Sequence, residues 1–114
     1  MELKTREIDN IIIYDIKGEL RMSEDMPIIL HEHVKSQLDE GKRHFLLNLK
    51  DVKFMDSFGV QQMVGCLISI SNVGGKLKLI NLVPRIQYIF DVTGLSRVFK
   101  ITADEETALK NYSE

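Results

Sequence analysis

Two kinds of apolar pattern alternate along this chain of 114 residues, and the alternation restricts it to one class of fold. Runs of Ile, Leu and Phe, typical of buried strands, are separated by segments in which apolar residues recur every three or four positions, as in amphipathic helices. Strands that alternate with helices form right-handed crossovers and a mainly parallel sheet. We expect strands at residues 3–8, 11–16, 44–49, 76–82 and 98–101, and helices at 26–40, 57–73, 84–93 and 102–109.

The order of these elements is β-β-α-β-α-β-α-β-α, which predicts a single α/β domain over residues 1–114 with a mixed, mainly parallel sheet. Asp9 and Asn10 offer a turn between the first two strands, so these form an antiparallel hairpin. Gly18 is expected to end the second strand. Residues 23–25 are expected to cap the first long helix, and residues 102–105 have the capping-box pattern that starts the last one.

The composition excludes several classes of protein. Lys and Arg total 15 and Asp and Glu total 17, so the formal net charge is −2 and a nucleic-acid surface is not expected. Ile, Leu and Val make up 34 of the 114 residues, too many for a disordered chain. Cys66 is the one cysteine, which excludes an internal disulfide and a cysteine zinc site. With no signal peptide and no apolar run long enough to insert into a membrane, we expect a cytoplasmic protein.

The segment between a central strand and the second long helix carries the most chemistry. Residues 51–57 are expected to form a loop at the carboxyl end of that strand, where ligands bind in open α/β sheets. Asp56 and Ser57 fall where the helix begins. Ser57 is therefore either a helix cap or an acceptor of phosphate, because free N–H groups and the helix dipole favour both.

A serine nucleophile is the weaker alternative. Met55 stands where a nucleophile elbow requires glycine. His31 and His33 point to different faces of their helix, and His44 lies at the opposite end of its strand. These histidines are expected to be solvated, so neither a catalytic triad nor a metal site is predicted. Cys66 is expected to be buried and inert, and Lys76 and Lys78 to form the solvent face of their strand. The chain is not expected to be an enzyme.

Five segments in order resemble the STAS domain, the family of bacterial anti-sigma factor antagonists. The segment from Asp51 to Val60 is similar to the signature loop of that family, and the resemblance extends over nearly the whole chain. The family fold has the same β-β-α-β-α-β-α-β-α order. The other matching segments are residues 18–20, 47–49, 74–77 and 90–95.

The resemblance implies a phosphorylation switch at Ser57. In the family, the serine after this aspartate is phosphorylated by an anti-sigma factor serine kinase, which also sequesters a sigma factor. The unphosphorylated antagonist binds this kinase and releases the sigma factor; phosphorylation blocks binding, and a Ser/Thr phosphatase reverses it. ATP and metal belong to the partners, so no cofactor is expected here. The partner-binding residues implied by the resemblance are Asp56, Ser57, Phe58, Gly59, Arg21 and Thr93.

Two residues depart from the family pattern. Arg21 follows Leu20 where relatives usually carry Asp. A cation at this position can change how a kinase docks, or can bind phosphate. Phe58 replaces a small polar residue and either packs beneath the helix or contacts the partner. These departures favour an alternative, a STAS scaffold that is not phosphorylated, or a soluble subunit of a transport system. A small-molecule enzyme or sensor is the third hypothesis.

Overall fold

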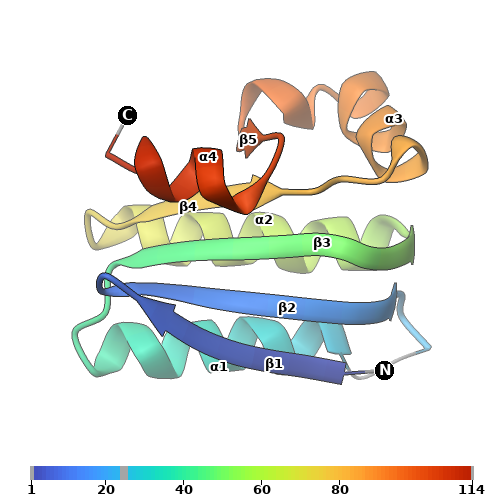
Figure 1. Ribbon diagram of the computed structural model, residues 1–114. Helices are drawn as coiled ribbons and strands as arrows, with labels where there is room; N and C mark the ends of the chain where they lie inside the picture. Colours follow the sequence, from blue (N-terminus) through green and yellow to red (C-terminus); the bar gives the residue numbers. More distant parts are fainter. Residues whose placement is uncertain (1, 24–25, 114) are drawn as a thin grey trace.

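The computed structural model describes residues 2–23 and 26–113 and contains a five-stranded sheet in the order β1-β2-β3-β4-β5 (Figure 1). The β1–β2 pair is antiparallel and the other neighbours are parallel. The predicted α/β class, element order and mixed sheet are confirmed. The strands are β1 (Glu2–Ile8), β2 (Ile11–Leu20), β3 (His44–Met55), β4 (Lys76–Ile80) and β5 (Lys100–Thr102).

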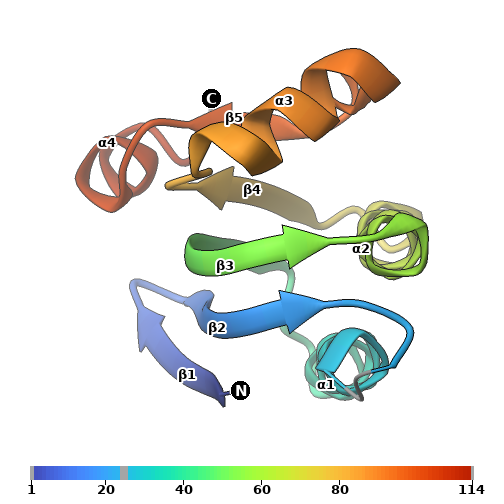
Figure 2. The ribbon, with the colours of Figure 1, turned by 90° about the vertical axis from the view of Figure 1, so that its right-hand side faces the viewer.

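Two long helices cover one face of the sheet, and a short C-terminal helix lies on the other (Figure 2). The two long helices, α1 and α2, pack side by side, and α4 contacts β4 and β5. Within the described ranges, none of the helices is long and apolar enough to cross a bilayer. The helices are α1 (Met26–Asp39), α2 (Ser57–Asn72), α3 (Pro84–Thr93) and α4 (Glu105–Lys110), with a 3-10 turn, η1 (Leu95–Arg97), after α3.

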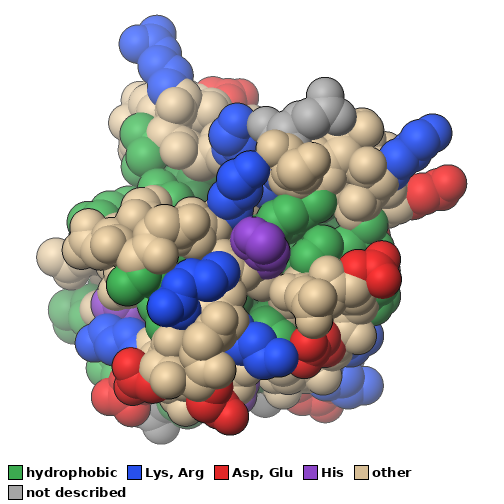
Figure 3. All heavy atoms as spheres, turned by 90° about the vertical axis from the view of Figure 1, so that its left-hand side faces the viewer, with side chains coloured by type: hydrophobic (Ala, Val, Ile, Leu, Met, Phe, Trp, Pro, Cys, Tyr) green, Lys and Arg blue, Asp and Glu red, His purple; other side chains and the backbone are tan. Residues whose placement is uncertain are grey.

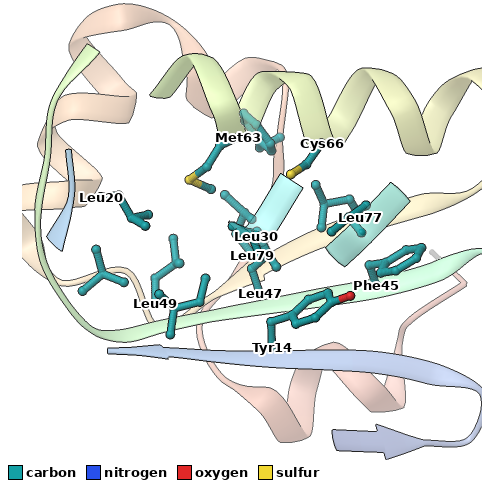
Figure 4. Close-up of a cluster of buried hydrophobic side chains, with 14 of the residues drawn as sticks. Tyr14, Leu20, Leu30, Phe45, Leu47, Leu49, Met63, Cys66, Leu77 and Leu79 are labelled. Carbon is teal, nitrogen blue, oxygen red and sulfur yellow. The ribbon is translucent and has the colours of Figure 1, made fainter. Parts of the chain in front are cut away.

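The main core lies between the sheet and the helices α1, α2 and α3 (Figure 4). Side chains of a strand alternate between the two faces, so alternate residues at the start of β2 and β3 point into this layer, and the spacing changes after the register irregularities. Cys66 is fully buried in it, as predicted, and burial raises the pKa of its thiol to about 12. The labelled members in Figure 4 are Tyr14, Leu20, Leu30, Phe45, Leu47, Leu49, Met63, Cys66, Leu77 and Leu79.

A second cluster packs under α4, on the other face of the sheet. Tyr112 anchors it, since its hydroxyl accepts a hydrogen bond from Phe45 N at 2.8 Å and lies 2.9 Å from the carbonyl of Lys76. Lys78 is 5% exposed, its Nζ donates to Asn111 O at 2.7 Å, and it lies over the Tyr112 ring. The prediction that Lys78 faces solvent is therefore wrong, because the C-terminal segment covers this face.

Several predicted boundaries are also wrong. Gly18 does not end β2, which runs on to Leu20 with a register irregularity beside Gly18. Most of the predicted loop at 51–57 is strand, because β3 pairs with this longer β2 as far as Met55. The last strand begins at Lys100, since η1 precedes it, and Asp104 caps α4 in place of the predicted Thr102. Glu24 and Asp25, part of the predicted cap of α1, lie outside the described residues.

Candidate functional site

The candidate site is the point where β3 ends and α2 begins, at the carboxyl end of the sheet (Figure 2). Asp56 has an extended backbone, and its side chain accepts a hydrogen bond from Gly59 N at 2.9 Å. Asp56 is therefore the N-cap, and Ser57 is the first helical residue. The interpretation of Ser57 as the cap is wrong, because the carboxylate before it already binds the free N–H group.

Asp56 also ties the helix to the end of β2. Its second carboxylate oxygen accepts a hydrogen bond from Met22 N at 2.9 Å, and its own N–H donates to Leu20 O at 3.1 Å. Hydrogen bonds from backbone N–H groups hold the pKa of the Asp56 carboxyl below its usual value; the bond from Gly59 contributes most and the bond from Met22 next. One ionised side chain thus joins two backbone segments that lie more than 30 residues apart.

Gly59 permits the close approach of α2 to β2. It is buried, and a Cβ atom on it would lie 2.1 Å from Leu20 O and 2.9 Å from Leu20 C. No side chain fits against a backbone carbonyl at that distance. Gly59, expected from the resemblance as a partner-binding residue, is buried here and positions the surface residues beside it.

Ser57 is the exposed group that this anchored turn presents. Its hydroxyl makes no hydrogen bond with any residue in the ranges 2–23 and 26–113. Phe58 follows it and is half-buried. Met22, whose N–H is held by Asp56, is 71% exposed and adds an apolar side chain at the same end of the molecule.

Arg21 lies beside this turn and is held by weak contacts. Its guanidinium carbon is 4.5 Å from the centre of the Phe54 ring, and Nη2 lies 2.9 Å from a carboxylate oxygen of Glu19. The Nε atom is enclosed, yet no described residue accepts its hydrogen bond. The positive charge of Arg21 also lowers the pKa of Asp56. Arg21 is thus close to the proposed phosphorylation site.

Thr93 lies apart from these residues in the chain, at the last position of α3. It is exposed, and its hydroxyl donates to Ile89 O at 2.6 Å in its own helix. The contacts above join Asp56 and Gly59 with Leu20 and Met22, and Ser57 stands between them in the chain, whereas Thr93 takes part in none of these hydrogen bonds. Its assignment to the partner surface rests on the resemblance alone.

The histidines do not form a catalytic or metal site with Ser57. His31 and His33 are only partly buried but are hydrogen-bonded, His31 to Gln62 and Ser69 and His33 to Tyr14, so the prediction that they are merely solvated is wrong. His44 is at the opposite end of the sheet, the end seen in Figure 3, where basic side chains and a histidine gather. The described part of the chain holds no cluster of three His, Cys, Asp or Glu suited to a metal.

A polar cavity of about 430 Å³ on the sheet face that carries α4 was missed at the sequence level. Arg6 crosses it and binds Asp15 at 2.6 and 2.9 Å and Glu105 at 2.6 and 3.2 Å. Asn48 donates to the same Asp15 at 2.8 Å. These groups satisfy one another and attach α4 to β1. The Arg6–Glu105 contact spans 99 residues, so no local pattern predicts it.

Comparisons with a family model, with protein sequences and with solved structures all point to the same family. The STAS domain model matches residues 2–108. The anti-sigma-B factor antagonist of Bacillus subtilis is 33% identical over 106 residues, covering 93% of this chain and 94% of that protein. The protein TM1081 of Thermotoga maritima has a TM-score of 0.90 at 25% identity, over 98% of this chain and 95% of its own. The Bacillus cell fate determinant SpoIIAA in its phosphorylated form shares the fold, with a TM-score of 0.76 at 21% identity over 97% and 99%.

Proposed function

Because the chain belongs to the STAS domain family, and to the anti-sigma factor antagonists within it, we propose that it binds an anti-sigma factor with serine kinase activity. Phosphorylation of Ser57 switches this binding off, and a Ser/Thr phosphatase restores it. In the unphosphorylated state the protein occupies the kinase and frees a sigma factor for transcription. This role belongs to the cytoplasm, where sigma factors act.

The observation that carries the proposal is the exposed Ser57 hydroxyl on a rigidly anchored turn. A kinase must reach the hydroxyl and hold it in line with the γ-phosphoryl group of ATP. Ser57 is exposed and has no hydrogen-bond partner among the described residues, while the residues on either side are fixed through Asp56 and the buried Gly59. This combination favours Ser57 as a substrate over a serine that is engaged inside the fold, such as Ser69, which bonds His31.

The chemistry of the switch belongs to the partner. The Ser57 oxygen forms a bond to the γ-phosphorus, the bond between that phosphorus and ADP breaks, and the hydroxyl proton passes to a base of the kinase. The modified side chain carries about −1.5 to −2 charges at neutral pH. A charge of that size on a surface that docks against a partner opposes binding by repulsion and by the cost of desolvation.

The docking surface is the exposed part of this end of the molecule. Ser57, Phe58 and Met22 lie within two short segments joined by Asp56, so a partner that docks on this end of the molecule can contact all three. Arg21 adds a cation at its edge. Asp56 has a positioning role, because both of its carboxylate oxygens are engaged with backbone N–H groups.

The test is phosphorylation and binding with the anti-sigma kinase of the same organism. We expect intact-mass measurement after incubation with kinase and Mg-ATP to show one added phosphate on the wild type and none on Ser57→Ala. Ser71→Ala is the matched control, since Ser71 is an exposed serine near the other end of α2. Ser57→Asp is expected to weaken binding of the kinase in calorimetry.

Absence of added phosphate on the wild type contradicts the switch for that kinase. Recovery of a transport ATPase and no kinase in a pull-down from cells supports the scaffold role instead.

A further inference from the structure

Arg21 lies beside the residue that precedes Ser57, because the residues on both sides of it are held there. Leu20 pairs with Met55 in the parallel ladder, and Leu20 O accepts a hydrogen bond from Asp56 N. On the other side of Arg21, Met22 N donates to the Asp56 carboxylate. The backbone of Arg21 is therefore fixed beside Asp56, the residue that precedes Ser57.

The guanidinium itself is only loosely held. Its pair with Glu19 is at the surface, with side chains 38% and 43% exposed, and ion pairs of this kind contribute little to stability. The group stacks on Phe54, and its enclosed Nε has no acceptor among the described residues, so a rotation that exposes Nε breaks no hydrogen bond of that atom. Arg21 thus has N–H donors for a new acceptor, and a rotation of its side chain breaks only the weak contacts with Glu19 and Phe54.

We infer that Arg21 binds the phosphate of phosphorylated Ser57 and gives up its ion pair with Glu19 when it does. A phosphate has three acceptor oxygens and up to two charges, and the guanidinium fork meets it with two parallel hydrogen bonds. Such a bond is stronger than the exposed contact with a single carboxylate oxygen of Glu19. This inference rests on the proposed function only for the identity of the phosphorylated residue.

The test needs no kinase, because phosphoserine can be inserted at position 57 of the full chain during translation. The second ionisation of phosphoserine has a pKa of about 6 and is followed by ³¹P NMR. A bound guanidinium favours the dianion and lowers this midpoint. We expect the midpoint in the Arg21→Gln protein to lie about half a pH unit above that of the parent, the size that a surface ion pair supports.

Two variants separate a specific contact from a general effect of charge. Lys53→Gln removes an equal charge from β3, close to Glu19, and is expected to move the midpoint by less than half as much. Glu19→Gln removes the competing carboxylate and is expected to lower the midpoint further. Circular dichroism of each variant confirms that the fold is retained.

Equal midpoints in the parent and Arg21→Gln overturn the inference, as does a shift in Lys53→Gln as large as that in Arg21→Gln. Failure of the kinase to modify Ser57 contradicts the proposed function and leaves this measurement unaffected. The measurement thus decides whether Arg21 binds a phosphate on Ser57, independently of whether Ser57 is phosphorylated in the cell.

Discussion

Replacing Gly59 by alanine tests how the candidate site is anchored. The added Cβ lies 2.1 Å from Leu20 O and 2.9 Å from Leu20 C, and neither atom belongs to a side chain that can turn away. The first turn of α2 must therefore move off β2, which also strains the hydrogen bond from Asp56 N to Leu20 O. Overpacking of this kind costs about 3 kcal/mol, and loss of one hydrogen bond adds about 1 kcal/mol.

The higher helix propensity of alanine offsets about 1 kcal/mol of that cost. We therefore expect the free energy of unfolding of Gly59→Ala to fall by about 3 kcal/mol and the melting temperature by roughly 10 °C. The assay is urea denaturation followed by circular dichroism. An unchanged slope with urea concentration shows that the change lies in stability and not in the compactness of either state.

Gly65→Ala is the matched control, since it lies in the same helix and gains the same helix propensity. Its Cβ meets the ring of His31 at 2.6 Å, the end of a side chain that can rotate at the expense of weak hydrogen bonds to Gln62 and Ser69. We expect it to remain within about 1 kcal/mol of the wild type. The reasoning is refuted if Gly59→Ala is as stable as the wild type, or is destabilised no more than Gly65→Ala.

Two further predictions concern single side chains. Tyr112→Phe removes the hydroxyl that binds Phe45 N and leaves a buried N–H unpaired, so we expect urea denaturation to show a loss of about 1–3 kcal/mol. The pKa of Asp56 is depressed in the folded state, so its contribution to stability is present above the ordinary value of 3.8 and lost as the pH falls through the folded pKa. Asp56→Asn can accept only one of the two hydrogen bonds, and its stability curve between pH 5 and pH 2 is expected to be flatter than that of the wild type; parallel curves contradict this role.

Elements with a strong local pattern were predictable from the sequence. The β-branched run of β2 predicts a strand, and the spaced apolar residues of α1 and α2 predict helices. The alternation of strands with helices then predicts the parallel sheet. The start of α2 was found correctly, but the cap was assigned to Ser57 when Asp56 performs it. Both residue types cap helices, and the hydrogen bond from Gly59 N to the Asp56 carboxylate shows that Asp56 is the cap.

Contacts between distant residues were not predictable. Lys78 alternates with apolar neighbours like any solvent-facing strand residue, and its burial depends on a C-terminal segment that docks more than 30 residues later. The same holds for the strand extension beyond Leu49. Residues 51–55 carry charged side chains typical of a loop, and they remain in β3 because the end of β2 continues to pair with them.

The anchoring of Ser57 favours a switch that acts through charge and not through a change of shape. Asp56 and Gly59 fix the start of α2 to the end of β2, so a phosphate on Ser57 cannot shift the helix without breaking those contacts. The whole chain carries a formal charge of −2, and one phosphate about doubles it at a single exposed point. Under the proposed function, a partner that docks on this end would meet nearly the same backbone in both states and a different local potential. If Arg21 binds this phosphate as we infer, it sets how much of that potential the partner meets, because a bound guanidinium cancels part of the charge at the surface.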